Sequence, residues 1–360
     1  MRKIGAADLD DIAVGAALLG AGGGGDPYIG SLMARHAIEQ HGPIDLLPLD
    51  DVPDDWHIIT CGGMGAPTVL LEKIPSGEEQ LAALRYYERI TGRKVDALIS
   101  IEAGGVNSCI PIMLAAQAGL PLIDADGMGR AFPKLEMITY NVYGVAASPV
   151  IVTDEKLDIC LVQSESAAAA EYMARGITIR MGGSTYTVSY PMDGTTVKRV
   201  AVPGTLSLTQ EIGRVVRAAR AERRDVVDAL IELFAGTSYG HAERLGAGKI
   251  SDLTRKEENG WSIGKLTVTP FDSTAELQVR FQNENLVVER DGMPITVVPD
   301  LICIIETDSG QAITTERLRY GQRVTLLGIR VPPVMRTDAA LAVFGPQAFG
   351  LEMVYRPLGL

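Results

Sequence analysis

The apolar pattern of this 360-residue chain changes character after about residue 165. Before that point, helical patterns alternate with short apolar runs typical of buried strands, which predicts helices on both faces of a mostly parallel sheet. After it, short strand patterns are separated by turn residues, and only residues 206–235 show amphipathic helical spacing. We therefore predict an α/β N-terminal domain over 1–165. We also predict a β-rich C-terminal domain over 166–360 that carries a helical insertion at about 206–235.

Capping residues mark where several helices are expected to begin. Asp8, the pair Asp26-Pro27, and Ser76 with Glu79 all stand at starts of this kind. The expected helices cover 8–19, 27–40, 76–90, 110–118, 206–220 and 225–234. The expected strands cover 44–49, 57–60, 97–101, 120–123, 177–181, 186–190, 197–202, 262–269, 275–282, 286–290, 295–298, 301–307 and 324–329.

The charge balance makes two classes of partner improbable. Lys and Arg number 33 against 45 Asp and Glu, a net charge of −12, so neither nucleic acid nor an anionic membrane is an expected partner. The uncharged stretch 103–123 contains Pro111 and Pro121 and is interpreted as protein core, not as a membrane span. The four cysteines form no Cys-x-x-Cys pair, and we place the protein in a reducing cytoplasm.

Three glycine-rich loops follow predicted strands of the first domain. They cover residues 61–67, 102–107 and 124–130, and the last two begin with a carboxylate. Because ligands bind outside the carboxyl ends of parallel strands, the three loops are expected to converge on one site.

Carboxylates in these loops are the candidate catalytic groups. Asp124 and Asp126 flank one alanine, so strand alternation would point them the same way, and their repulsion would raise one pKa for acid–base work. We expect them to share one pocket with Glu102, with Asp126 as the base. The pair could instead share a divalent metal, or cap a turn with a salt bridge to Arg130. Arg130 and Asn107 are candidate substrate ligands, although Asn107 could equally cap the helix that follows.

The run Gly22–Gly25 looks like a phosphate loop. A helix precedes it where a nucleotide motif needs a strand, however, and Gly-Lys-Ser/Thr is missing, so no nucleotide is expected. We expect Gly23, Gly24 and Gly25, with Asp26, to bind a substrate carboxylate or polarised carbonyl at the start of the next helix. The alternative is a turn between two helices in which Asp26 is a plain N-cap.

Other chemistries have weaker patterns. The histidines show no zinc-site spacing, and no Gly-x-Ser-x-Gly elbow is present. Cys61 and Cys109 lie in or beside the loops, which leaves a thiol nucleophile open. In the second half, Asn283 and Glu284 would suit hydrogen bonds to a polar heterocycle, or equally a β-turn.

Long motifs from both halves match one family pattern. They are Gly22–Pro27, Glu102–Asn107, Asp124–Pro133, Phe281–Glu284, Pro299–Ile302, Arg319–Gly321, Gly345-Pro346 and Phe349-Gly350. Together they resemble the S-methyl thiohydantoin desulfurase family over nearly the whole chain. The resemblance implies an N-terminal domain followed by a distinct C-terminal domain. It also implies hydrolytic removal of sulfur, as a thiol, from the carbon between the two nitrogens of a hydantoin-like five-membered ring.

Two functions are compatible with these features. The first is a hydrolase whose water is activated by a carboxylate, or by a metal that carboxylates hold, while loop N–H groups stabilise the tetrahedral intermediate. The second is a non-catalytic small-molecule binder or a partner subunit of a hydantoinase. The acid-bearing loops favour the hydrolase, because a neutral heterocyclic ring needs no carboxylates for binding. The sequence does not fix the oligomeric state and leaves a homo-oligomer open.

Overall fold

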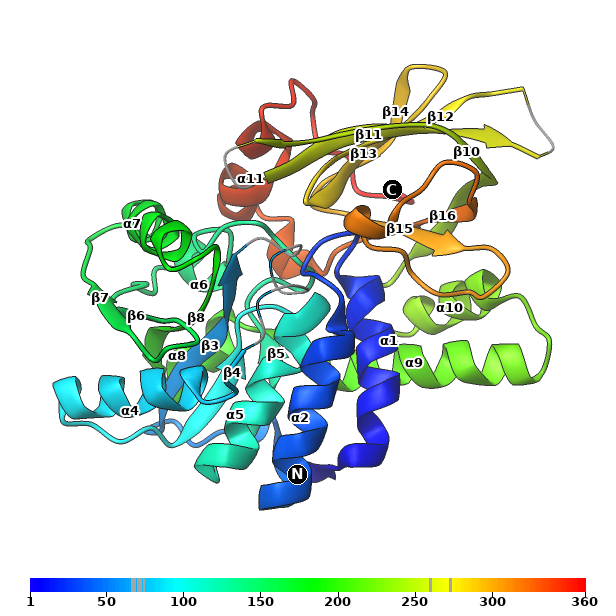
Figure 1. Ribbon diagram of the computed structural model, residues 1–360. Helices are drawn as coiled ribbons and strands as arrows, with labels where there is room; N and C mark the ends of the chain where they lie inside the picture. Colours follow the sequence, from blue (N-terminus) through cyan, green and yellow to red (C-terminus); the bar gives the residue numbers. More distant parts are fainter. Residues whose placement is uncertain (66–68, 70–72, 74, 259–260, 272–273) are drawn as a thin grey trace.

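Two β-sheets organise the molecule, one in each half of the chain, as the computed structural model in Figure 1 shows. The structure describes residues 1–65, 69, 73, 75–258, 261–271 and 274–360. The predicted architecture, an α/β domain followed by a β-rich domain with inserted helices, is confirmed.

The first sheet has a parallel centre with antiparallel strands added to it. Its strands are β1 (Arg2–Ile4), β2 (Ile44–Pro48), β3 (His57–Gly65), β4 (Ala97–Ser100), β5 (Leu122–Asp126), β6 (Val150–Thr153), β7 (Ile159–Val162), β8 (Ser184–Asp193) and β9 (Val202–Pro203). Their order is β1-β2-β5-β4-β3-β8-β6-β7, and β9 pairs with β5 beside this path. The pairs from β2 through β5 and β4 to β3 are parallel, and the others are antiparallel.

Helices cover both faces of this sheet because its central strands alternate apolar side chains between them. Ile59 and Leu98 enter one buried cluster, and Ile58 and Ile99 enter another. The first face carries α2 (Pro27–His41), α4 (Glu79–Thr91) and α5 (Ile110–Ala118); the second carries α7 (Ala167–Arg180), α8 (Gly194–Val200) and α9 (Thr205–Ala221). Within the part of the chain that the structure describes, no helix combines the length and apolar character needed to cross a membrane.

The second sheet is antiparallel throughout. Its strands are β10 (Ala242–Glu258), β11 (Trp261–Pro270), β12 (Leu277–Gln282), β13 (Glu284–Arg290), β14 (Met293–Val297), β15 (Leu301–Glu306) and β16 (Arg323–Ile329), in the order β14-β13-β12-β11-β10-β16-β15. Val287, Leu301 and Leu327 belong to the same buried cluster as Ile58 and Ile99 of the first sheet. The two halves therefore share one continuous apolar core.

The helical insertion is packed onto the N-terminal helix. It consists of α9 and α10 (Val226–Ala235), and α9 lies against α1 (Leu9–Leu19). A Cβ atom on Gly213 would lie 2.1 Å from the carbonyl oxygen of Asp11, and one on Gly15 would lie 1.9 Å from that of Thr209. Only glycine allows the two backbones to come this close.

Two predicted strands are wrong. Residues 177–180 continue α7 as a helix, and residues 197–200 belong to α8, so neither predicted strand forms. Both helices begin at N-caps that were not used in the prediction. Ser166 accepts from the backbone N–H of Ala169, and Asp193 accepts from that of Thr196. Strands from beyond residue 165 also join the first sheet, because β8 lies between β3 and β6 and β9 pairs with β5. A short third group of helices follows β16, with α11 at Asp338–Phe344.

Candidate active site

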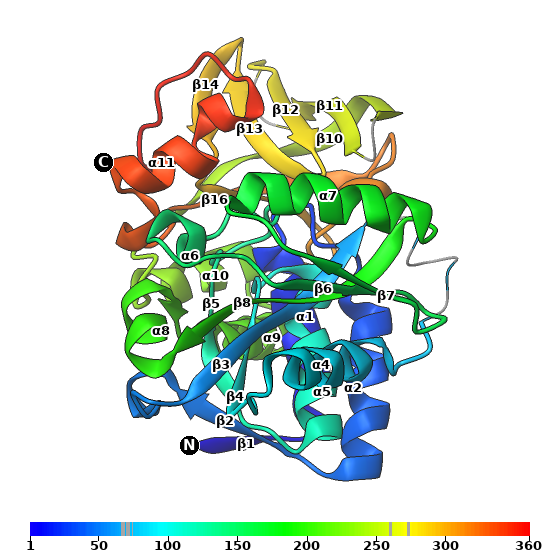
Figure 2. The same ribbon diagram turned by 90° about the vertical axis from the view of Figure 1, so that its left-hand side faces the viewer.

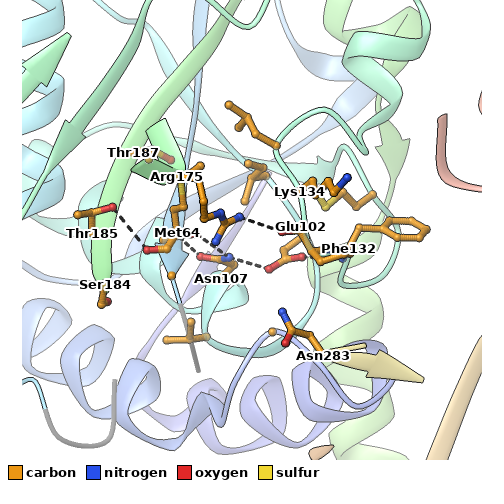
Figure 3. A pocket seen from close by; sticks show the side chains of 18 of the residues that line it. Met64, Glu102, Asn107, Phe132, Lys134, Arg175, Ser184, Thr185, Thr187 and Asn283 are labelled. Atoms are coloured by element: carbon orange, nitrogen blue, oxygen red, sulfur yellow. Dashed lines mark hydrogen bonds between the residues drawn. The ribbon is translucent and has the colours of Figure 1, made fainter. Parts of the chain in front are cut away.

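A pocket lies where the two halves meet, and Figure 3 shows its lining. The space inside it is about 80 Å³, several times the roughly 10–15 Å³ that one water needs. The described lining residues come from β3 and its neighbour β8, from the loops after β4 and β5, from α7, from the glycine run before α2, and from the turn between β12 and β13. They are Gly24, Gly63, Met64, Gly65, Ile101, Glu102, Val106, Asn107, Met128, Phe132, Pro133, Lys134, Leu135, Arg175, Ser184, Thr185, Tyr186, Thr187, Asn283 and Glu284.

Glu102 stands just beyond the end of β4 and is 5% exposed. Its Oε1 accepts a hydrogen bond from Asn107 Nδ2 at 2.7 Å, and its Oε2 accepts one from the backbone N–H of Phe132 at 3.1 Å. Burial raises the pKa of Glu102 to about 8, against the opposing effect of the Asn107 hydrogen bond. Nearby Glu284 raises it further by like-charge repulsion.

Asn107 fixes how Glu102 is held. It lies in the short 3₁₀ helix Gly105–Ser108, and its Oδ1 accepts from the backbone N–H of Gly63 at 2.6 Å. Since that N–H can only donate, the amide nitrogen of Asn107 must face Glu102, as Figure 3 shows. Asn107 thus connects the end of β3 to the carboxylate at the end of β4.

Glu284 brings a second carboxyl group to the pocket from the other domain. It is the first residue of β13, 3% exposed, and follows Asn283, which has a left-handed φ of 59°. Burial raises its pKa to about 8, opposed chiefly by the charge of Arg130 and less by that of Arg175. Among the described residues, no group forms a hydrogen bond with its Oε2.

Asn283 shapes the turn that presents Glu284. Its Oδ1 accepts from the backbone N–H of Ser262 at 2.9 Å, and its carbonyl accepts from the hydroxyl of Thr315 at 2.8 Å. The side chain lines the pocket near Glu102 (Figure 3). Sequence reasoning found both residues of this turn.

Two basic residues of the lining, Arg175 and Lys134, were missed by the sequence analysis. Arg175 on α7 donates from Nε to Glu171 at 2.7 Å and from Nη2 to the carbonyl of Pro133 at 2.9 Å. Its guanidinium also lies 5.1 Å from the ring centroid of Trp261 on β11. Extending the helical pattern from Ala167 through residues 177–181 would have placed Arg175 on a helix facing the sheet.

Asp124 and Asp126 do not line this pocket, so the three predicted catalytic carboxylates are not brought together there. Asp124 accepts from the backbone N–H of Ser207 at 2.9 Å and also from its hydroxyl. Asp126 is 0% exposed, and its Oδ2 accepts from the backbone N–H groups of Ala103, Met128 and Gly129 at 2.7, 3.1 and 2.8 Å.

The physical reason for their position is the length of β5, which runs through both aspartates. Alternation does point the two side chains the same way, but toward the start of α9, where Thr205 also hydrogen-bonds to Asp126. Burial raises the pKa of Asp126 to about 7. Its contacts connect the loops after β4 and β5, so it supports residues of the pocket without lining the pocket itself.

Arg130 is fully buried and also lies outside the pocket lining. Its Nη1 donates to the carbonyls of Pro299 and Asp300 at 3.0 and 2.9 Å, and its Nε donates to that of Ala131 at 3.1 Å. The predicted alternative of a salt bridge to Asp124 or Asp126 is not found among the described ion pairs. Arg130 instead joins the loop after β5 to the second sheet, and its charge acts on Glu284.

The glycine run forms the junction between the two domains, and of its candidate ligands only Gly24 lines the pocket. A Cβ on Gly23 would lie 2.1 Å from Oε1 of Glu284, and one on Gly24 would lie 2.9 Å from the carbonyl of Gly104. Gly24 and Gly25 have φ of 73° and 72°. Asp26 caps α2 through the N–H of Tyr28 at 3.0 Å and pairs with Arg317 of the second domain.

The remaining candidate chemistries lie away from the pocket. Cys61 and Cys109 are buried outside its lining, where burial raises the pKa of both thiols, that of Cys109 to about 12. Residues 66 and 67 of the first predicted loop lie outside the described residues. Among the residues that the structure does describe, no three His, Cys, Asp or Glu side chains are grouped so as to hold a metal ion.

Comparison with known proteins agrees with this two-domain arrangement and assigns a family. The chain belongs to the S-Me-THD-like family: the model of its N-terminal domain matches residues 7–164, and that of its C-terminal domain matches residues 165–358. An X-ray structure of a protein from Chromobacterium violaceum has the same fold, with a TM-score of 0.81 and 22% identity over 99% of this chain and 100% of that one. No curated protein matches the chain.

Proposed function

We propose that the chain is a hydrolase of a hydantoin-like ring, which breaks a carbon–sulfur bond and releases a thiol. The observation that carries the proposal is the pair Glu102 and Glu284. They are two buried carboxyl groups from different domains that line one pocket, each with a pKa of about 8. Carboxyl groups kept partly protonated near neutral pH suit acid–base work on a neutral ring. Family membership and the motif resemblance support the choice of ring.

The hydrogen-bond partners assign different roles to the two acids. Glu102 accepts an N–H on each oxygen, an arrangement that favours its ionised form, so it serves as the base. Glu284 is as buried but has no hydrogen-bond donor on Oε2 among the described residues, which favours the protonated form, so it serves as the acid.

The reaction then balances with these two groups. Glu102 takes a proton from water, whose oxygen bonds to the ring carbon that bears sulfur, while Glu284 protonates the adjacent ring nitrogen. The tetrahedral intermediate collapses when its hydroxyl returns a proton to Glu284 and a carbonyl forms. The carbon–sulfur bond breaks, and the departing sulfur takes the proton held by Glu102. The products are the hydantoin and the thiol, and both carboxyl groups end as they began.

The state of the cysteines supports a reducing compartment. The cysteines of the structure, Cys61, Cys109, Cys160 and Cys303, are all free thiols. We infer a cytoplasmic enzyme that acts on a small heterocycle.

The test is release of methanethiol from an S-methyl thiohydantoin, followed with a thiol reagent. Glu102→Gln and Glu284→Gln keep the shape of each side chain but remove its titrating proton, so each is expected to lower kcat by about 10²-fold or more. Glu39→Gln on the exposed side of α2 is the matched control and should turn over like the wild type. Binding of the ring by calorimetry without any thiol release would favour the non-catalytic binder or hydantoinase partner instead.

A further inference from the structure

Helix α7 presents an exposed stripe on the side that faces away from the pocket. The stripe consists of Tyr172, Met173, Gly176, Ile179 and Arg180, whose spacing of one, four, seven and eight residues places them on one helical face. Tyr172 is 83% exposed, Ile179 56% and Met173 40%. Figure 2 shows α7 in front of the first sheet, and Figure 1 shows it at the margin of the molecule.

The stripe is symmetric about Gly176. Met173 and Ile179 stand three residues to either side of it, and Tyr172 and Arg180 stand four residues to either side. A second copy of α7 laid antiparallel across Gly176 would therefore place Met173 against Ile179 and Tyr172 against Arg180, twice over. An interface between identical chains related by a two-fold axis needs this kind of self-complementary surface.

Neither a close contact with the described residues nor its backbone conformation requires a glycine at position 176. A Cβ added to it would meet no atom within 4 Å, and its backbone is ordinary helix. Glycine inside a helix is less favourable than alanine. At the crossing point of two helices, however, the missing side chain lets the backbones approach closely and brings the flanking residues into contact.

The facing pairs are complementary in chemistry as well as in position. The guanidinium of Arg180, which forms no ion pair in the described part of the chain, would lie over the ring of Tyr172 of the other copy as a cation–π pair. A groove beside the stripe, lined by Leu161 and Val162 of β7 and by Ile177 and Met181, adds apolar surface that the crossing helix would cover.

We propose that the chain forms a two-fold symmetric homodimer through antiparallel packing of α7 on α7 of a second copy, centred on Gly176. The proposal does not depend on the reaction assigned to the pocket.

Sedimentation velocity on the full-length chain tests it. The wild type should sediment as a dimer of about 77 kDa, twice the 38.4 kDa of one chain. Gly176→Glu should sediment as a monomer with the dimer dissociation constant raised about 100-fold or more, because two carboxylates would meet at the axis. Ala218→Glu adds the same charge to the exposed side of α9 and should leave the dimer intact. A cooperative thermal transition in each variant would show that both remain folded.

Swapping the side chains at positions 172 and 180 tests the antiparallel alignment of the two helices. Tyr172→Arg alone should weaken the dimer because it places Arg against Arg180, and the double variant Tyr172→Arg with Arg180→Tyr should restore it. A monomeric wild type, a Gly176→Glu variant that stays dimeric while folded, or a double variant no tighter than Tyr172→Arg would each overturn the proposal.

Discussion

The same functional group is placed in two different environments at Glu102 and Glu284. Both side chains are almost fully buried, and burial raises both pKa values. Only Glu102 receives a hydrogen bond on each oxygen, from Asn107 and from the backbone of Phe132. A difference in hydrogen-bond donors, not in burial, therefore separates the proposed base from the proposed acid.

The pH dependence of turnover follows from these shifts. Below pH 7 both carboxyl groups hold their protons, since each pKa is about 8, and the base is scarce. As pH rises, one proton leaves the pair and activity increases; when the second leaves, the acid is lost and activity falls. We expect a bell-shaped profile of kcat/KM with its maximum near pH 8. A profile that is flat from pH 5 to 7 would show that the essential carboxyls titrate at ordinary values and would contradict this prediction.

The free energy of unfolding should fall as pH rises. This is opposite to the effect of a carboxylate whose pKa is lowered on folding. The folded state holds the Glu284 proton up to a pKa of about 8, whereas an unfolded glutamate releases it near 4.3. The folded state therefore binds more protons between these values, and its stability falls as pH rises through that window. Glu284→Gln removes the proton linkage, so its melting temperature should exceed that of the wild type by several degrees at pH 9 and by less at pH 5. A gap that does not depend on pH would argue against a raised pKa in the folded protein.

At the level of elements, the glycine run works as a joint between the domains. The carbonyl of Gly22 accepts from the backbone N–H of Thr315 at 2.8 Å, and that of Ala21 accepts from the N–H of Asn285 at 2.8 Å. The run thus holds the end of α1 and the start of α2 against the second sheet, next to Glu284. Its small residues are required by these contacts, whether or not substrate also touches Gly24.

Gly23→Ala tests that joint without straining the backbone, since Gly23 is not in a left-handed conformation. The added Cβ would occupy the position of the Glu284 carboxylate, so we expect kcat to fall about tenfold or more through displacement of the acid. Gly236→Ala is the control, because its Cβ would approach nothing closer than 3.6 Å. If Gly23→Ala turned over at the wild-type rate, Glu284 would not be the acid or would not be held by this contact.

Elements whose signals are local could be predicted from the sequence. The helices at 9–19, 27–41 and 110–118 appear as expected because their end signals are local. A glycine follows each of the three helices, and Asp26 caps the start of the second. The strand predicted at 177–181 failed because the run Ile177-Thr178-Ile179 favours a strand by its own β-branched residues, while helix α7, already begun at Ala167, continues through it. A preference over three residues cannot reveal what the preceding turns impose.

The candidate site was predictable to a similar extent. Glu102, Asn107, Asn283 and Glu284 line the pocket because they stand where strands end, which is visible in the sequence. Asp124 and Asp126 share that property, but β5 runs on through them and carries them past the pocket. How far a strand continues depends on its pairing with β4, β2 and β9, and those partners are distant in sequence.

At the scale of the whole molecule, we expect that the N-terminal half does not fold without the C-terminal half. Strand β8 lies between β3 and β6, so a chain cut after residue 165 lacks the strand that joins the β6–β7 pair to the rest of the first sheet. It also lacks α9, which packs on α1. We expect the fragment 1–165 to aggregate or to show no cooperative unfolding by circular dichroism, whereas the full chain unfolds cooperatively. A fragment 1–165 with a sharp thermal transition would contradict this prediction.

The origin of the two pocket acids in different halves also sets an order of events during synthesis. Glu284 leaves the ribosome about 180 residues after Glu102, a delay of roughly ten to forty seconds at common rates of translation. Until then Glu102 has no second carboxyl beside it and no second sheet near it. We therefore expect it to have the ordinary pKa of a glutamate and to be ionised at neutral pH. The second sheet buries both acids and raises their pKa values, so we expect the protein to take up protons from water as that sheet closes over the pocket.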